Sequence, residues 1–311
     1  MKPPVMGEVG EASRNKGSED ALSRSDPSEP GDLGGEVRFT ARMYVEHYLA
    51  TRGLTLGDLE VAPTMVGTWF RGVTRRLTEA TGATQCERWL YPEDTGHGAY
   101  TARVDGQAVS FITYPVGAPA TVTMMEELAA AGVRRFIGLG MCGSLQETVP
   151  VGSVVLPGRC VREEGTSAHY VPPEEEVGPH PPLAGLLGGL LHEAGLRPVA
   201  GPHWTTDAPY REYIWKIERY RSEGVIAVDM ETSAMYAFGR ARGLEVANVL
   251  VVSDELWREW RPGFWGEELR QAFVRVVTVL AEGLGRLALP LDSEPQRSYN
   301  WRCNGEPLTR G

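Results

Sequence analysis

Two acidic residues occupy places where a carboxylate could take part in chemistry. Glu231 lies where the apolar segment GVIAVDM meets a helical pattern, and Asp254 ends the apolar segment VANVLVVS. A carboxylate can accept hydrogen bonds from two hydroxyl groups, so Glu231 could hold a vicinal diol. Apolar neighbours raise the pKa of a carboxyl group, so Asp254 could donate a proton. Two simpler interpretations stay open: Glu231 caps its helix, and Asp254 opens a loop.

A glycine-rich segment, GLGMCG at 138–143, follows a third apolar strand. It matches the pattern GxGxxG, but a dinucleotide site also needs a helix that begins there and holds the pyrophosphate. The following residues, SLQETVPVGSVVLPG, have no helical period. We therefore expect a glycine turn through which the backbone approaches a ligand, with a purely structural turn as the alternative.

Isolated histidine, cysteine and tryptophan residues give weaker indications. A lone His169 beside Tyr170 is more often structural than catalytic, and Cys142 is too loosely related to it to predict a thiol nucleophile. The tryptophans at 257, 260 and 265 fit core packing or an aromatic lid that excludes water.

Charge and cysteine usage exclude several classes of partner. The 311-residue chain has a formal net charge of −10 at pH 7, which on average repels nucleic acid and anionic membranes. Its four cysteines are scattered without CxxC spacing, as in a cytosolic protein with reduced thiols and no zinc site. The first residues lack the apolar core of a signal peptide, so we expect a cytoplasmic location.

The elements that must position the candidate residues alternate along the chain. Residues 1–35 and 291–311 have few aliphatic side chains and are predicted to be disordered tails around a single domain at 36–290. Within it, strand patterns at 108–116, 133–140, 153–158, 224–230 and 246–253 alternate with helical patterns at 120–132, 181–196, 231–243 and 264–288. This alternation predicts an α/β fold with a mostly parallel central sheet, whose ligands bind beyond the carboxyl ends of the strands.

Six segments, in this order, resemble the nucleoside phosphorylase family, which includes uridine phosphorylase, hexameric purine nucleoside phosphorylase and the methylthioadenosine/adenosylhomocysteine nucleosidases. They are VGAPATVTMMEEL, FIGLGMCGSLQ, VGSVVLPGRCVREEGTSAHYVPP, WTTDAPYRE, VDMETSAMYAFG and VLVVSDELW. The resemblance spans roughly 61–288. It implies one α/β domain with a central twisted mixed sheet flanked by helices, and a homo-oligomer, dimer or hexamer, with sites near a subunit interface.

The resemblance also implies roles for individual residues. Glu231 matches the carboxylate on the ribose hydroxyls, Met230 the methionine under the sugar, and Asp254 the acid that faces purine N7. Pro209 and Tyr210 match the strand that stacks on the base, with proline where an aromatic residue is usual. Gly140, Met141, Gly143 and His169 complete the expected substrate contacts. A carboxylate at the sugar and a proton donor at N7 would stabilise the charges that develop as the bond breaks.

Departures from the family concern the anion and the base. The phosphate loop GDPxR is replaced by APTMVGTWFRG, and Gly138 and Met141 stand where the family has arginine and threonine or serine. Arg71, Arg75 or an arginine of a neighbouring subunit could compensate. The Gln-x-Arg pair that reads uracil is missing after Tyr210, which favours a purine.

The expected function is therefore cleavage of a purine nucleoside to free base and ribose-1-phosphate. The enzyme would use phosphate as co-substrate and need no cofactor or metal. Two alternatives remain: a nucleosidase that uses water, and a non-catalytic homologue that binds nucleosides.

Overall fold

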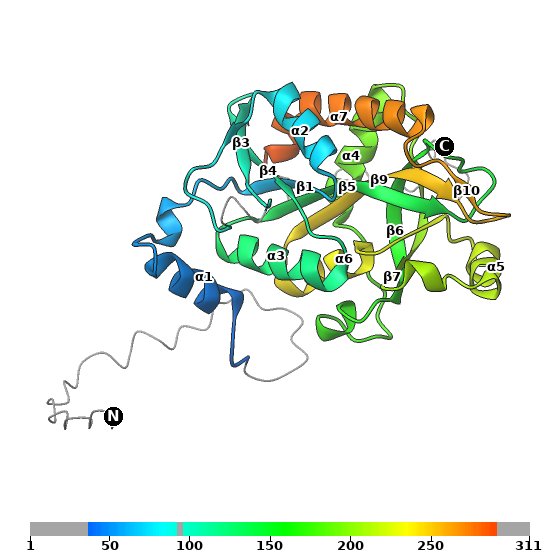
Figure 1. Cartoon of the computed structure of the whole chain (residues 1–311), viewed down its shortest axis with the longest axis horizontal. Helices are drawn as coiled ribbons and strands as arrows, with labels where there is room; N and C mark the ends of the chain where they lie inside the picture. Colours follow the sequence, from blue (N-terminus) through cyan, green and yellow to red (C-terminus); the bar gives the residue numbers. More distant parts are fainter. Residues whose placement is uncertain (1–36, 92–95, 291–311) are drawn as a thin grey trace, which may run out of the picture.

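The sheet is one mixed assembly of ten strands among the described residues, 37–91 and 96–290, of this computed structural model (Figure 1). Both predicted tails, 1–35 and 291–311, lie outside the described residues. The strands are β1 (Thr64–Thr68), β2 (Thr84–Gln85), β3 (Tyr100–Val104), β4 (Gln107–Thr113), β5 (Arg135–Ser144), β6 (Val154–Glu163), β7 (Val199–Thr206), β8 (Ala227–Asp229), β9 (Glu245–Glu255) and β10 (Arg261–Pro262).

The strand order is β10-β9-β6-β7-β8-β5-β1-β4-β3-β2, and β9 also pairs with β5. Strands β5, β9, β6, β7 and β8 therefore form a closed ring, from which β1, β4, β3 and β2 continue as an open sheet. Pairs β1–β5 and β5–β9 are parallel, whereas β5–β8 and β6–β9 are antiparallel. The mixed sheet expected from the resemblance is confirmed. Its closure into a ring was not predicted from the sequence.

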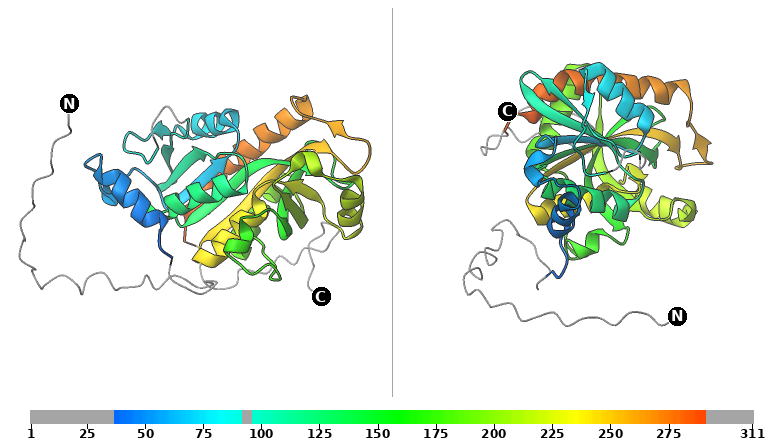
Figure 2. Two further views of the ribbon diagram at one scale, coloured as in Figure 1. Left: turned by 60° about the horizontal axis from the view of Figure 1, so that its bottom comes forward. Right: turned by 60° about the vertical axis from the view of Figure 1, so that its left-hand side comes forward.

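Helices cover both faces of the sheet, as Figures 1 and 2 show. Helices α2, α4 and α7 lie on one face, and α3 and α6, with α1 against α3, lie on the other. The helices are α1 (Ala41–Ala50), α2 (Arg71–Thr81), α3 (Ala118–Ala130), α4 (Pro181–Glu193), α5 (Ile214–Ser222), α6 (Thr232–Arg242) and α7 (Glu267–Ala288). The α/β fold class is thereby confirmed.

Local sequence signals set where these helices begin and end. Pro181 opens α4, where its missing N–H costs no hydrogen bond. Helices α2 and α6 end at Gly82 and Gly243, whose left-handed backbone glycine adopts without strain. Glu267 and Glu268 lie in the first turn of α7, where their negative charges stabilise the positive end of the helix dipole. The four predicted helices are confirmed within a few residues at each end.

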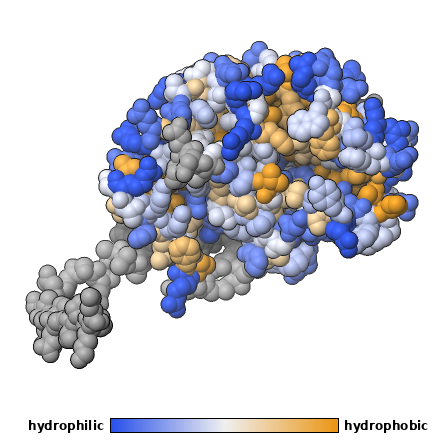
Figure 3. Space-filling view, viewed as in Figure 1, coloured by the Kyte–Doolittle hydropathy of each residue, from blue (hydrophilic) through white to orange (hydrophobic). Residues whose placement is uncertain are grey.

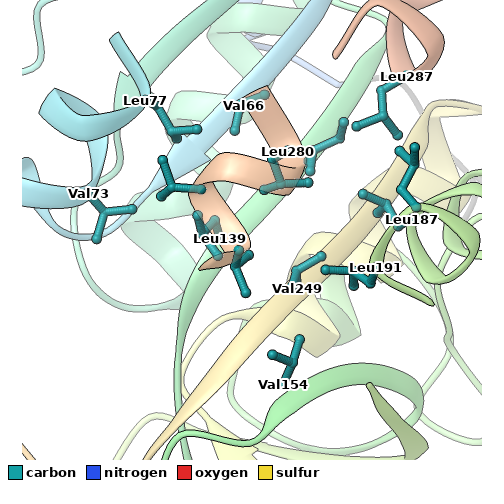
Figure 4. Close-up of a cluster of buried hydrophobic side chains, with 14 of the residues drawn as sticks. Val66, Val73, Leu77, Leu139, Val154, Leu187, Leu191, Val249, Leu280 and Leu287 are labelled. Atoms are coloured by element: carbon teal, nitrogen blue, oxygen red, sulfur yellow. The ribbon is translucent and has the colours of Figure 1, made fainter. Parts of the chain in front are cut away.

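One of the two main apolar clusters among the described residues fills the space between α2, α4, α7 and the strands β1, β5 and β9 (Figure 4). It includes Val66, Val73, Leu77, Leu139, Val154, Leu187, Leu191, Val249, Leu280 and Leu287, all buried. Each such side chain stabilises the fold by roughly 1.5–3 kcal/mol relative to its exposed state. The cluster fixes the middle of β5 and β9, whose carboxyl ends carry the candidate residues.

The glycine-rich segment is extended strand, so the predicted glycine turn is wrong. All of 138–143 lies within β5, and the need for glycine comes from close packing. A Cβ added to Gly140 would lie 2.8 Å from the Trp69 ring, and one added to Gly143 would lie 2.7 Å from Leu256. Both partners are distant in sequence, so the pattern alone could not show them.

Candidate active site

A cavity of about 660 Å³ opens at the carboxyl ends of β5, β8 and β9, the place expected for an α/β sheet. On the face shown in Figure 3, apolar residues gather toward the right-hand half, where Figure 1 places β9 and β10. The cavity is lined by Trp69, Phe70, Val116, Met141, Cys142, Gly143, Pro209, Tyr210, Glu212, Val228, Asp229, Met230, Glu231, Ser253, Asp254, Leu256, Trp260 and Phe264.

Asp254 lies inside β9, so the interpretation that it opens a loop is wrong. A register shift after Cys142 pairs Gly143 with Asp254 and aligns this end of β9 with the cavity. Ser253 Oγ donates a hydrogen bond to Asp254 Oδ1 at 2.7 Å, and Trp260 Nε1 donates to Oδ2 at 2.9 Å. Burial raises the pKa of Asp254, and these two hydrogen bonds partly oppose that rise. The two hydrogen bonds fix the position of the carboxyl group, and its raised pKa favours its protonated form.

Glu231 immediately precedes α6, but its side chain makes no capping hydrogen bond. Its Oε1 accepts a hydrogen bond of 2.6 Å from the backbone N–H of Gly117, at the start of α3. Asp229 takes the capping role, because its Oδ2 accepts the Thr232 N–H at 3.0 Å. The capping interpretation of Glu231 is therefore wrong, and its carboxylate faces the cavity.

The charge of Asp229 affects the ionisation of Glu231. Burial, and then the charge of Asp229, raise the pKa of Glu231 to about 8, while the Gly117 N–H opposes this rise. Asp229 itself accepts a hydrogen bond of 2.8 Å from Thr205 Oγ1, and His203 Nε2 lies 3.1 Å from its Oδ1. Glu231 therefore becomes charged most readily when a ligand supplies hydrogen-bond donors.

The structure brings most of the predicted site residues together. Seven line the cavity: Asp254, Glu231, Met230, Met141, Gly143, Pro209 and Tyr210. Pro209 and Tyr210 belong to a 3₁₀ turn after β7, not to the expected strand, and Tyr210 is almost fully exposed. Gly140 and His169 are not among the lining residues. Gly140 packs against Trp69, and His169 is exposed at the end of another 3₁₀ turn.

The family model for the "Phosphorylase superfamily" matches residues 80–286 of this chain. The chain belongs to the phosphorylase superfamily. It is 28% identical over 167 residues to the guanosine phosphorylase of Halorubrum lacusprofundi, covering 54% of this chain and 69% of that protein. It is 25% identical over 203 residues to the uridine phosphorylase of Salmonella typhimurium, covering 61% and 79%.

Among solved structures, the chain is similar to purine nucleoside phosphorylase from Toxoplasma gondii in complex with immucillin-H. The TM-score is 0.66 at 23% identity, over 82% of this chain and 98% of that one. This likeness concerns the fold and confirms the expected architecture. The family match and the named relatives, not this structure, confirm the recognition of the chain as a phosphorylase-type enzyme.

Sequence reasoning missed two acids that this superfamily member places in its cavity. Asp229 stands two positions before Glu231 in VDME, and it could have been found by its place at the strand end. Glu212 follows the 3₁₀ turn Pro209–Arg211 and had no comparable signal. Burial and the charge of Asp254 raise the pKa of Glu212 to about 7.

The structure places the three tryptophans and Cys142 in different surroundings. Trp260 lines the cavity and contacts Asp254, whereas Trp265 is almost fully exposed. Trp257 lies beneath the Arg258 guanidinium, 4.5 Å from ring centre to Cζ. Burial raises the pKa of the Cys142 thiol well above its ordinary value, which disfavours the reactive thiolate.

Basic residues are missing from the described lining of the cavity, which contains four carboxyl groups and no lysine, arginine or histidine. Arg71 begins α2 directly after the lining residue Phe70, but its side chain is exposed. Arg75 is also exposed and lies 3.9 Å from Glu79. Within residues 37–91 and 96–290, no group of acidic, histidine or cysteine side chains is arranged to hold a metal ion. No helix of these same ranges is long and apolar enough to cross a membrane.

Proposed function

We propose that this phosphorylase superfamily member cleaves the N-glycosidic bond of a purine nucleoside and transfers the ribose to phosphate. The observation that carries the proposal is the presence of Asp254 and Glu231 in one cavity, each held by hydrogen bonds and each with a raised pKa. The names of the relatives, guanosine, uridine and purine nucleoside phosphorylases, support the reaction class but leave the base open.

The two acids fit the charges of the reaction. As the bond breaks, positive charge grows on the ribose and negative charge on the departing base. The Glu231 carboxylate would accept hydrogen bonds from the ribose hydroxyls and stabilise the positive sugar. Asp254, whose pKa is raised by burial, would donate its proton to the base.

The position of Asp254 supports a purine. A purine offers N7 as a proton acceptor in its five-membered ring, and a pyrimidine has no such ring. A protonated carboxyl group needs an acceptor for its O–H, since a buried donor without a partner is costly. Trp260 and Ser253 both donate hydrogen bonds to Asp254. In this geometry neither of them accepts a hydrogen bond from the protonated Asp254, so the acceptor must come from a bound base.

One observation favours water as an alternative acceptor. The described cavity lining holds four carboxyl groups and no basic side chain, and this combination repels phosphate. For phosphorolysis we propose a homo-oligomer, dimer or hexamer, in which an arginine of a neighbouring copy approaches the cavity. No cofactor enters the proposal, and the cytoplasmic location stays a prediction.

The test is an assay of products with guanosine, inosine, adenosine and uridine, each with and without phosphate. Phosphorolysis predicts free purine base and ribose-1-phosphate, formed only when phosphate is present. Equal rates of ribose release without phosphate would establish the nucleosidase. Binding of nucleosides without turnover under either condition would overturn both reactions and leave the non-catalytic homologue.

A further inference from the structure

Glu212 differs from the other three acids of the cavity because its hydrogen-bonding capacity is unused. Asp254, Glu231 and Asp229 each accept hydrogen bonds from the protein. Among the described residues, no group donates a hydrogen bond to the Glu212 carboxylate, although this side chain is partly buried and lines the cavity. A partly buried carboxylate without donors is unfavourable, and a bound ligand can supply them.

The four acids of the cavity come from three places in the fold: Asp229 and Glu231 stand at and just after the end of β8, Asp254 stands near the end of β9, and Glu212 follows the 3₁₀ turn Pro209–Arg211. The charge of Asp254 contributes to the raised pKa of Glu212, whereas the charge of Asp229 contributes to that of Glu231. Gly143 of β5 pairs with Val228 of β8 and with Asp254 of β9, so Asp229 and Asp254 reach the cavity from opposite edges of β5. Pro209 and Tyr210, which the family resemblance assigns to the base, line the cavity directly before Glu212, so we place Glu212 at the base end of the cavity with Asp254.

The chemistry of the bases decides what a carboxylate at this end would bind. An ionised carboxylate offers only acceptors, and it binds best to two N–H donors side by side. Guanine presents such a pair, N1–H and the 2-amino group. Hypoxanthine has N1–H alone, adenine turns the lone pair of N1 toward the carboxylate, and uracil places its N3–H between two carbonyl oxygens. Donation from a base to Glu212 also favours its charged form.

We propose that Glu212 selects the base, and that it selects one with two adjacent N–H donors, as in guanosine. This inference rests on the proposed function, in which Asp254 faces N7 of the same purine. The N7 edge and the N1/N2 edge belong to different sides of one purine ring, so Asp254 and Glu212 can contact a single base without competing for the same atoms.

The test compares kcat/KM for guanosine, inosine and adenosine in the wild-type protein, Glu212→Gln and the control Glu218→Gln. Glu218 is exposed on the neighbouring helix α5, so its exchange leaves the cavity unchanged. We expect the wild type to prefer guanosine, then inosine, then adenosine. Glutamine replaces one acceptor by an NH₂ donor, so the guanosine-to-adenosine ratio should fall roughly 10- to 100-fold. The ratio of Glu218→Gln should match the wild type.

Two outcomes distinguish failure of this inference from failure of the proposed function. A wild type that cleaves purine nucleosides with the same guanosine-to-adenosine ratio as Glu212→Gln overturns the role of Glu212 alone. A wild type that cleaves no nucleoside overturns the proposed function, and calorimetric titration with guanine and adenine then tests Glu212 directly. Equal affinity for the two bases would overturn the inference. If Glu212→Gln does not fold, Glu212→Ala serves the same comparisons.

Discussion

The substitution Asp254→Asn isolates proton donation from the rest of the site. Trp260 Nε1 can only donate, so the asparagine oxygen must face it and the asparagine NH₂ must face Ser253. Ser253 Oγ can accept from that NH₂ while it donates to the carbonyl of Cys142, 3.2 Å away. The side chain keeps its partners, and its NH₂ group is engaged away from the base.

The expected loss is therefore chemical. A general acid contributes on the order of 100-fold or more, so kcat/KM for a purine nucleoside should fall by at least ~100-fold, or roughly 2.7 kcal/mol of transition-state stabilisation. The free energy of unfolding at pH 7 should change by less than about 1 kcal/mol, because the replacement is isosteric and keeps the hydrogen bonds to Ser253 and Trp260.

Steady-state kinetics on inosine or guanosine, together with chemical denaturation, measure both quantities. Asp105→Asn is the matched control, since Asp105 is exposed and asparagine readily adopts its left-handed backbone, φ 49°. A folded Asp254→Asn protein whose kcat/KM stays within about threefold of the wild type would refute proton donation by Asp254.

Four further predictions concern the cavity and the strand β5 beside it. In the wild type, kcat/KM should rise as the pH passes about 8 and Glu231 ionises. In Glu231→Gln, kcat/KM should be much lower throughout, and its pH profile should lack this rise. Since folding raises the pKa of Glu231, the free energy of unfolding should fall between about pH 5 and 8 in denaturation series, and less steeply in Glu231→Gln. Gly140→Ala should lower the free energy of unfolding by roughly 1–3 kcal/mol, because its methyl group meets Trp69. Trp260→Phe removes a hydrogen bond that lowers the pKa of Asp254, so the part of the kcat/KM profile due to Asp254 should move to higher pH.

Much of the fold could be predicted because its signals are local. Helical periodicity, a proline at the start of α4 and a glycine after α6 act within a few residues. The strand ends that carry Glu231 and Asp254 followed from apolar runs meeting acidic residues. Closure of the ring could not be predicted, because the pairing of β5 with both β8 and β9 joins segments about a hundred residues apart.

By itself, the sequence determined five of the strands and four of the helices in their order, the family, and two acids worth testing. Only the tertiary structure decided which carboxylate caps α6, since Asp229 and Glu231 are two positions apart and differ in side-chain direction. It also decided that the glycines of β5 accommodate packed side chains and that Glu212 shares a cavity with Asp254. The physical reason is common to these cases: burial, charge and steric contact depend on neighbours in space, and those neighbours come from distant parts of the chain.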